Sequence, residues 1–184
     1  QISGAGTDLI TVVGMDSLKG AEHVVIADRI EAGTFLLAAV ATQGDVTVLN
    51  TNPDHLTSFL AKLRETGATV ETQGTRIRVQ AKERCKAVEV TTLPYPGFPT
   101  DLQAQMMATL CIADGVSVIR ETVFENRFMQ VAELVRMGAQ IDLDGWIPTA
   151  DPVALDFEIG DARVCGTQLF ERVLVRQAGH VSVG

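Results

Sequence analysis

The sequence repeats itself at a spacing of 71 residues, and this duplication constrains the fold more than any other feature. Shifting residues 28–74 onto residues 99–145 places three glycines on glycines at positions expected to form turns. The matched pairs are Gly44 and Gly115, Leu63 and Leu134, Gly67 and Gly138, Ala68 and Ala139, and Gly74 and Gly145. Three glycines in register indicate a duplicated structural unit. The fold must therefore be one that two similar units can build together.

The first copy predicts a strand, a helix, a second strand, a second helix and a hairpin. The second helix has the strongest signals, since Asn52 can cap it and Pro53 takes its first position, where a missing N–H costs nothing. An apolar stripe at helical spacing follows, and Gly67 ends the helix. The other expected elements are a strand at 10–13, a helix at 30–42 ended by Gly44, a strand at 46–49 and hairpin strands at 68–72 and 76–80.

The second copy predicts the same order of elements. Thr100 and Gln103 form a capping-box pattern, which predicts a helix from Thr100 to about residue 113. The remaining expected elements are strands at 87–91, 116–120 and 139–143 and a helix at 125–137. The first helix of each copy is apolar nearly all round, which is typical of buried helices. We therefore expect an α/β fold in which helices pack inside a ring of sheets.

The last part of the chain does not continue the repeat. The position equivalent to Ile77 is Pro148, and a proline is unlikely in a central strand because it removes a ladder hydrogen bond. Residues 163–175 fit a strand or a helix equally well. We expect a first repeat unit at 1–80, a second at 81–146, and an unmatched tail at 147–184 that packs on the same lobe.

Composition excludes several classes of protein. The 184 residues carry a formal net charge of −8, which argues against a surface for nucleic acid or an anionic membrane. The three cysteines are not spaced as a zinc site or a disulfide framework, and the three histidines show no metal-ligand spacing. No apolar stretch is long enough to span a membrane, and the first residues do not form a signal peptide. We expect a cytoplasmic protein that needs no metal or cofactor.

Two turns of the second copy carry the candidate functional residues. Residues 94–101 form a stiff, proline-rich loop that leads to Asp101, which is either an acid favoured by a helix dipole or a carboxylate placed to accept a proton. Residues 121–128 contain Arg127, which is either a solvated side chain or a site residue placed against the expected helix dipole. Because these turns are corresponding connections of one unit, they are expected to share an edge that binds a polar sugar or a nucleotide diphosphate.

Three sequence runs in this order resemble motifs of the UDP-N-acetylglucosamine enolpyruvyl transferases. Residues 28–35 (DRIEAGTF) resemble DRIETGTF, residues 95–105 (YPGFPTDLQAQ) resemble YPGFPTDMQAQ, and residues 121–129 (ETVFENRFM) resemble the start of ETIFENRFMHV. The resemblance covers about residues 3–146. It implies one lobe of an inside-out α/β barrel, built from βαβαββ-like repeats with helices inside and sheets outside.

The resemblance also implies a reaction and roles for individual residues. The family transfers the enolpyruvyl group of phosphoenolpyruvate to the 3-hydroxyl of UDP-N-acetylglucosamine, a step of peptidoglycan synthesis. Asp101 corresponds to the general base at that hydroxyl, Val123 to a residue that contacts the UDP-sugar, and Arg127 to an arginine that faces the cleft. Thr100 and Phe124, beside these residues, are expected to contribute to substrate binding.

Other parts of the family pattern have no counterpart here. The Gly-Cys loop with the catalytic cysteine, the Lys and Arg residues that grip phosphoenolpyruvate, and the third repeat of the lobe are not found in this sequence. We therefore expect a lobe that is inactive alone and binds phosphoenolpyruvate only with the missing lobe. The alternative is a non-catalytic UDP-sugar-binding or interaction module derived from that enzyme. Apolar surface exposed by a missing repeat is expected to be covered in a homodimer or by the tail.

Overall fold

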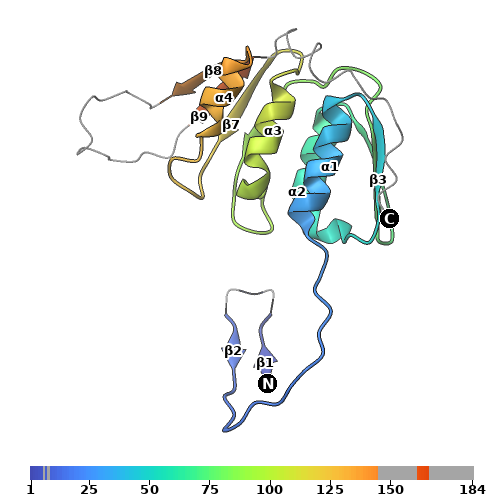
Figure 1. The fold of residues 1–184 in the computed structure, drawn as a ribbon, viewed down its shortest axis with the longest axis vertical. Coiled ribbons are helices and arrows are strands. Elements are labelled where there is room, and N and C mark those ends of the chain that lie inside the picture. The colour runs from blue at the N-terminus through green and yellow to red at the C-terminus, as the bar shows by residue number, and fades with distance from the viewer. Residues whose placement is uncertain (6, 8, 145–160, 166–184) are drawn as a thin grey trace, which may run out of the picture.

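The computed structural model describes residues 1–5, 7, 9–144 and 161–165, with side-chain burial given for all of these except 144 and 161–165. Two sheets lie on the outside and helices lie between them, as Figure 1 shows. Helices α1 (Arg29–Ala41) and α3 (Gln103–Leu110) pack against each other in the middle. Helix α2 (Thr57–Glu65) packs on α1, and α4 (Gln130–Arg136) packs on one sheet. The expected arrangement of helices inside and sheets outside is confirmed.

The first unit has a three-stranded antiparallel sheet in the order β3–β5–β4. Its strands are β3 (Asp45–Val48), β4 (Thr69–Gln73) and β5 (Arg76–Gln80), and the 3-10 turn η1 (Pro53–Leu56) precedes α2. Asn52 caps η1 as predicted, since its Oδ1 accepts a 3.0 Å hydrogen bond from the backbone N–H of Asp54. Ile77 and Val79 turn their side chains into the core from β5. The predicted hairpin is confirmed.

The second unit has a four-stranded sheet in the order β6–β7–β9–β8. Its strands are β6 (Glu89–Thr91), β7 (Val116–Arg120), β8 (Gln140–Asp144) and β9 (Asp161–Cys165), and the 3-10 turn η2 (Thr100–Leu102) precedes α3. Strands β6 and β7 are parallel, whereas β7, β9 and β8 are antiparallel neighbours. The order β7–β9–β8 matches β3–β5–β4 of the first unit.

The expectation that the pattern stops after residue 146 was wrong. Strand β9 takes the place in the second sheet that β5 takes in the first. Two residues separate β4 from β5, whereas 16 separate β8 from β9, so the second connection is 14 residues longer. A comparison at a fixed spacing of 71 therefore loses register at this point. Pro148 and the rest of the tail, at 147–160 and 166–184, lie outside the described residues.

The helices of the two units meet at equivalent positions. Nε2 of Gln105 on α3 lies 3.2 Å from Oγ1 of Thr34 on α1, and these residues are 71 positions apart. Close to this contact, the buried side chain of Leu102 lies against Gly33, where an added Cβ would be only 2.5 Å from Cδ1 of Leu102. The glycine thus lets the start of the α3 segment approach α1 closely.

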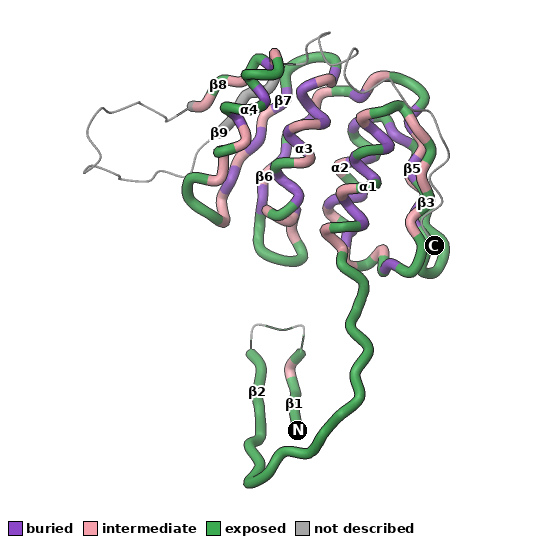
Figure 2. The backbone as a smooth tube through the Cα atoms, in the orientation of Figure 1, coloured by how far each residue is buried: buried purple, intermediate pink, exposed green. Residues whose placement is uncertain are grey.

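One side of α1 faces outward, contrary to the expectation of complete burial. Phe35 is 43% exposed, and Ala38 on the same helix and Ala104 on α3 are exposed as well. Most other residues of both helices are buried or partly buried, as the colours in Figure 2 show. A helix that is apolar all round predicts partners on every side. Among the described residues, none covers this side.

The N-terminal strand does not lead into the first unit's sheet as predicted. Strand β2 (Thr11–Val12) instead pairs with β1 (Ile2–Ser3) in a small antiparallel hairpin. Figures 1 and 2 show this hairpin away from the packed body, joined to α1 by an extended, exposed segment. Asp28 at the end of this segment caps α1 by accepting a 2.7 Å hydrogen bond from the N–H of Ile30. Within the described part of the chain, no helix has the length and apolar character to cross a membrane.

Candidate functional site

The candidate site lies where two neighbouring parallel strands end. Thr91, the last residue of β6, is opposite Arg120, the last residue of β7, and the N–H of Thr92 donates a 2.9 Å hydrogen bond to the carbonyl of Arg120. The loops at 92–99 and 121–129 therefore leave the sheet at the same edge. In open α/β sheets, ligands usually bind outside the carboxyl ends of parallel strands. Both sequence motifs with candidate residues fall on these loops.

The first loop is anchored so that it delivers Asp101 to this edge. Its ends are held by a 3.0 Å hydrogen bond from the N–H of Leu93 to the carbonyl of Phe98. The ring of Phe98 is buried and lies 5.9 Å from the ring of Phe59 of α2, measured between centroids. Asp101 follows in η2 with a side chain that is 54% exposed. The backbone that carries Asp101 is thus held in place, while its carboxylate is open to solvent.

Arg127 reaches Asp101 from the second loop. Its Nη2 donates a 2.6 Å hydrogen bond to Oδ1 of Asp101, and its guanidinium lies 5.2 Å from the centre of the Phe124 ring. Asn126 adopts a left-handed backbone conformation with φ of 54°, which asparagine tolerates better than most residues. The prediction that the two turns share an edge is confirmed, and Asp101, Phe124 and Arg127 come together there.

The predicted helix at 125–137 begins later than expected. Helix α4 starts at Gln130, so Arg127 lies in the loop before it. The argument that Arg127 sits against a helix dipole was therefore wrong. The preceding turn holds the backbone in another conformation, because Glu121 accepts hydrogen bonds from the N–H groups of Val123 and Phe124. Because the Glu121 side chain binds these amides, the helix begins only after this turn.

Glu121 is the centre of the hydrogen bonds that join the two loops. Its side chain is almost completely buried, with the residue 1% exposed. Oε1 accepts hydrogen bonds from Oγ1 of Thr92 at 2.7 Å and from the N–H groups of Val123 at 2.9 Å and Phe124 at 3.2 Å. Oε2 accepts one from Oγ1 of Thr100 at 2.9 Å. One carboxylate therefore ties together the strand end, the turn with Val123 and the residue before Asp101.

The capping-box interpretation of Thr100 and Gln103 was wrong. Neither η2 nor α3 has a side-chain cap. Thr100 uses its hydroxyl for Glu121, and the buried amide of Gln103 donates from Nε2 to the carbonyl of Arg127 at 3.3 Å. Oε1 of Gln103 accepts a 2.8 Å hydrogen bond from Nε2 of Gln130 on α4. Side chains that could have capped a helix instead hold the second loop in place.

Sequence reasoning missed Glu121, Thr92 and Gln103 as residues that build the site. The sequence signal for the first two is their position, since each directly follows a parallel strand of one unit. A carboxylate and a hydroxyl at adjacent strand ends predict a polar contact between the loops. No sequence feature pointed to Gln103 as a site residue, because the capping-box spacing already explained a glutamine at this position.

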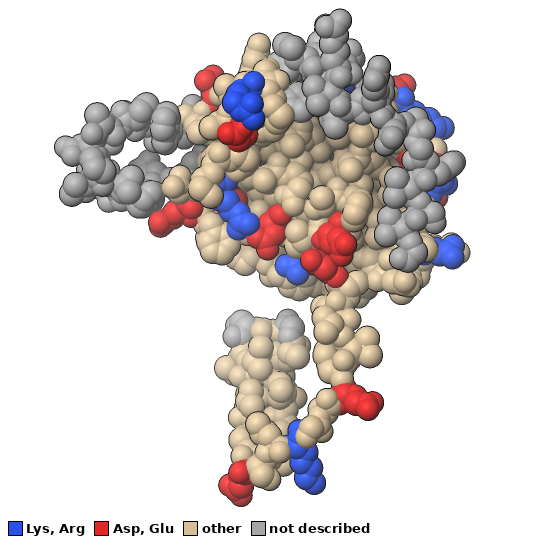
Figure 3. Space-filling model, in the orientation of Figure 1, with Lys and Arg blue, Asp and Glu red and all other residues tan. Residues whose placement is uncertain are grey.

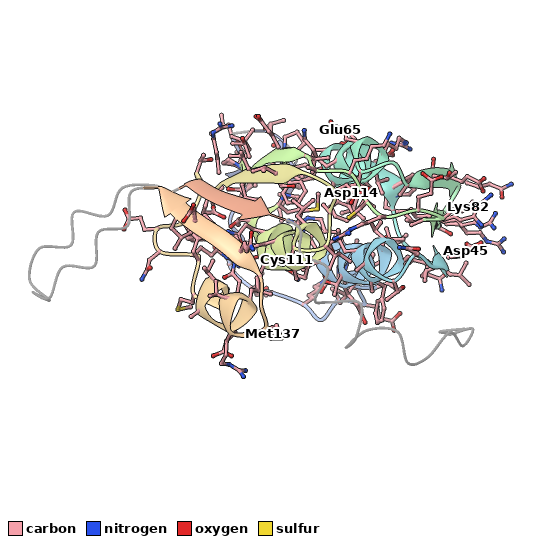
Figure 4. The ribbon with its side chains drawn as sticks, turned by 90° about the horizontal axis from the view of Figure 1, so that it is seen from above. Asp45, Glu65, Lys82, Cys111, Asp114 and Met137 are labelled. Atoms are coloured by element: carbon pink, nitrogen blue, oxygen red, sulfur yellow. The ribbon has the colours of Figure 1, made fainter. Side chains whose placement is uncertain are left out.

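The buried cysteines are unsuited to nucleophilic chemistry. Cys85 and Cys111 are both buried, and burial raises the pKa of each thiol to about 11. Figure 4 shows Cys111 at the end of α3 in the interior, whereas the labelled Asp45, Glu65 and Lys82 lie at the periphery. Cys111 is therefore a packing residue of the core. Among the described residues, no group of three His, Cys, Asp or Glu side chains could hold a metal ion.

Comparison with known proteins identifies the class to which this fold and site belong. The sequence profile of the family described as EPSP synthase (3-phosphoshikimate 1-carboxyvinyltransferase) matches residues 1–168. The chain therefore belongs to this family of carboxyvinyltransferases. The solved structure of the enolpyruvyl transferase NikO from Streptomyces tendae has the same fold, with a TM-score of 0.60 at 23% identity over 77% of this chain and 31% of that one.

Within the family, the curated proteins similar to this chain include UDP-N-acetylglucosamine 1-carboxyvinyltransferases. The enzyme of Thermotoga maritima is 49% identical over all 184 residues, and that of Halothermothrix orenii is 47% identical over the whole chain. An enzyme of Symbiobacterium thermophilum is 57% identical over 79% of the chain, which spans 34% of that relative. The chain spans 43% of the Thermotoga protein and 46% of the Halothermothrix protein.

These alignments correct the expected extent of the resemblance. The tail at 147–184 was expected not to match, but the first two relatives align over the whole chain and the family profile extends to residue 168. The tail is therefore part of the similarity to the family. Its strand β9 completes the second sheet, so the match has a structural basis.

Proposed function

We propose that this chain forms the part of a UDP-N-acetylglucosamine 1-carboxyvinyltransferase that binds the UDP-sugar and supplies the base for its 3-hydroxyl. The observation that carries the proposal is the contact between Arg127 and Asp101 at the shared edge of the two loops. It lies in a chain whose relatives at 47–49% identity have that activity in their names. The reaction would serve peptidoglycan synthesis in the cytoplasm.

The geometry of Asp101 suits a general base. Arg127 holds Oδ1, and no described residue donates a hydrogen bond to Oδ2. A hydroxyl that approaches Oδ2 can transfer its proton there while Arg127 fixes the plane of the carboxylate. General bases need such positioning before they need a particular pKa. The role of Asp101 as the base and of Arg127 as its orienting partner is a proposal from this geometry.

Two of the groups beside Asp101 that remain free are hydrogen-bond acceptors. Thr100 and the backbone N–H groups of Val123 and Phe124 already donate to Glu121. The lone pairs of the Thr100 hydroxyl and the carbonyl oxygen of Val123 have no donor among the described residues. A ligand that engages these two acceptors must bring hydroxyl or amide donors, which an N-acetylated sugar has. The half-exposed ring of Phe124 offers an apolar surface for the carbon face of the sugar.

The same chain is poorly suited to hold phosphoenolpyruvate. Transfer of the enolpyruvyl group requires an acid, a base and a cationic cradle for several negative charges. The chain has 15 Lys and Arg residues against 23 Asp and Glu residues. Figure 3 shows acidic and basic side chains intermixed on the face in view, without a concentration of positive charge. We propose that phosphoenolpyruvate binds only together with the other lobe and that this chain is inactive alone.

Calorimetry with UDP-N-acetylglucosamine tests the binding half of the proposal. The wild-type chain should bind the nucleotide sugar, and Asp101→Ala should weaken binding about tenfold, the equivalent of one charge-assisted hydrogen bond. Asp16→Ala is a matched control, because Asp16 is exposed in the N-terminal segment. Equal affinities for wild type and Asp101→Ala would contradict the assignment of Asp101.

A phosphate-release assay with both substrates tests the catalytic half. The chain alone should release no phosphate, and turnover by it would overturn the view that it is incomplete. Adding the portion of the Thermotoga maritima enzyme that this chain does not span should restore turnover, and Asp101→Ala should abolish the restored activity. Saturable sugar binding without any turnover in the mixture would instead support the alternative, a non-catalytic UDP-sugar-binding module. That alternative is favoured by the burial of Cys85 and Cys111, which raises the pKa of both thiols to about 11.

A further inference from the structure

We propose that Glu121 is a positioning residue that fixes which groups of the sugar site donate hydrogen bonds and which accept them, and that it thereby holds Asp101 in register with the sugar 3-hydroxyl. The inference rests on the proposed function, since it concerns the same site. Nothing in the reaction requires a second carboxylate here. The structure nevertheless buries one between the two loops, with the residue only 1% exposed.

The burial of Glu121 is compensated by donors alone. Four groups donate to its two oxygens, namely the hydroxyls of Thr92 and Thr100 and the backbone N–H groups of Val123 and Phe124. A buried carboxylate is tolerated when its lone pairs are satisfied in this way. Because every partner donates, replacing one carboxylate oxygen by an amide NH₂ group conflicts with one of these bonds. An amide of the same shape would pack equally well, but only a carboxylate can accept all four hydrogen bonds.

The bond to Thr100 connects Glu121 to the proposed base. Oε2 of Glu121 accepts from Oγ1 of Thr100 at 2.9 Å, and Asp101 is the next residue along the chain. Since the Thr100 hydrogen points at Glu121, the hydroxyl can only accept from a ligand. The other oxygen binds the amides of Val123 and Phe124, whereas the Val123 carbonyl stays free to accept from a ligand. Glu121 thus makes the Thr100 hydroxyl an acceptor toward a ligand and occupies the N–H donors of Val123 and Phe124.

Glu121→Gln separates this role from a purely structural one. The amide has nearly the same shape, and its oxygen can keep the three bonds that Oε1 makes. Its NH₂ group would face Thr100, whose hydroxyl must then turn its hydrogen toward the ligand. The site changes from acceptor to donor next to Asp101, with little change in packing. Glu125→Gln is the matched control, because Glu125 is an exposed glutamate in the same loop.

Calorimetry on the full 184-residue chain with two ligands measures the effect. The ligands are UDP-N-acetylglucosamine and its 3-deoxy analogue, which lacks the 3-hydroxyl that would donate its proton to Asp101. Glu121→Gln should weaken binding of the natural sugar about tenfold and that of the 3-deoxy analogue less than about twofold, since only the former uses the positioned base. Glu125→Gln should change neither. Equal losses for both ligands, or no loss for either, would overturn the positioning role.

A ligand-free measurement keeps the inference separate from the proposed function. If the wild-type chain binds neither nucleotide sugar, the proposed function fails for this chain, and the carbon-13 signal of the Asp101 carboxyl then decides about Glu121. That signal should shift in Glu121→Gln and stay unchanged in Glu125→Gln. An unchanged Asp101 signal in both variants would refute the inference. Should Glu121→Gln fail to fold, Thr100→Val removes the single bond between Glu121 and the Asp101 segment and is measured in the same way.

Discussion

Nη2 of Arg127 lies 2.6 Å from Oδ1 of Asp101 and joins two loops whose contributing residues are 26 positions apart. The side chains are 35% and 54% exposed, so water screens their attraction. Exposed ion pairs typically stabilise a fold by less than about 1 kcal/mol. The contact therefore has little value for stability, which fits a role in orienting the carboxylate.

A double-mutant cycle on this pair should give a small coupling energy for unfolding. We expect Arg127→Ala, Asp101→Ala and the double variant to show a coupling of about 0.2–1 kcal/mol in urea denaturation, because both side chains remain partly hydrated. The exposed pair of Arg136 and Glu133, 2.7 Å apart within α4, serves as the reference. A coupling several times that of the reference pair would show that the contact is mainly structural.

Gly33→Ala should destabilise the protein even though alanine favours helices. A Cβ at this position would lie 2.5 Å from Cδ1 of Leu102, which is fully buried. Overpacking of this kind costs about 1–3 kcal/mol, which exceeds the gain of about 1 kcal/mol in helix propensity. Urea denaturation measures the change. Gly20→Ala is the control, because no atom lies within 4 Å of the added Cβ. Similar stabilities of the two variants would show that α1 and η2 separate more easily than this contact implies.

The sequence predicted the elements whose signals are local. Asn52 caps its turn as expected, and the strand at Val116–Arg120 has the predicted bounds. The prediction failed where a residue distant in sequence forms the hydrogen bond that a local helix cap was expected to form. Thr100 and Gln103 have capping-box spacing, but Glu121 and the carbonyl of Arg127 engage them instead. Such contacts depend on how two strand ends meet, which spacing along the chain does not specify.

The second wrong prediction came from the length of the connection between β8 and β9. Strand β9 repeats the part played by β5, but its connection is 14 residues longer, so a comparison at fixed spacing placed Pro148 where a strand residue was required. A hairpin tolerates a longer loop at small entropic cost, because closure entropy grows only with the logarithm of loop length. The sheet can therefore retain its order after the sequence register is lost. The contact between Asp101 and Arg127, in contrast, was predictable, because their two turns are corresponding connections of one unit.

The two buried cysteines, Cys85 and Cys111, should make stability fall at alkaline pH. Burial raises the pKa of the Cys85 and Cys111 thiols from 9.0 to about 11, so between these values the unfolded chain loses protons that the folded chain keeps. Stability is then unaffected by these groups below about pH 9 and decreases as the pH rises toward 11. Each thiol contributes at most about 1.4 kcal/mol per pH unit.

Urea denaturation at several pH values, in a Cys165→Ser background, measures this slope. Replacing Cys85 and Cys111 by alanine should make the decline above pH 9 shallower, and the native thiols should resist alkylation at pH 8. If the double variant declines as steeply as the parent, other groups cause the pH dependence.

The outward side of α1 should make the chain self-associate. Phe35 is 43% exposed, Ala38 on α1 and Ala104 on α3 are exposed as well, and the hydrogen bond between Thr34 and Gln105 holds these two helices side by side. Exposed apolar surface of this kind is normally covered by a partner. A second copy of the chain would bury it, and sedimentation velocity should then show a dimer that dissociates on dilution.

Phe35→Glu should shift the sedimentation profile to the monomer, because burying an unpaired carboxylate in such an interface is unfavourable. Met129→Glu is the control, since Met129 is also exposed but lies in the loop before α4. The alternative is that the tail covers α1 within one chain. Wild type would then be monomeric, and removal of residues 166–184 would produce the dimer. A monomer in both forms would show that the outward side of α1 drives no association, whereas dissociation by both glutamate variants would place the interface elsewhere.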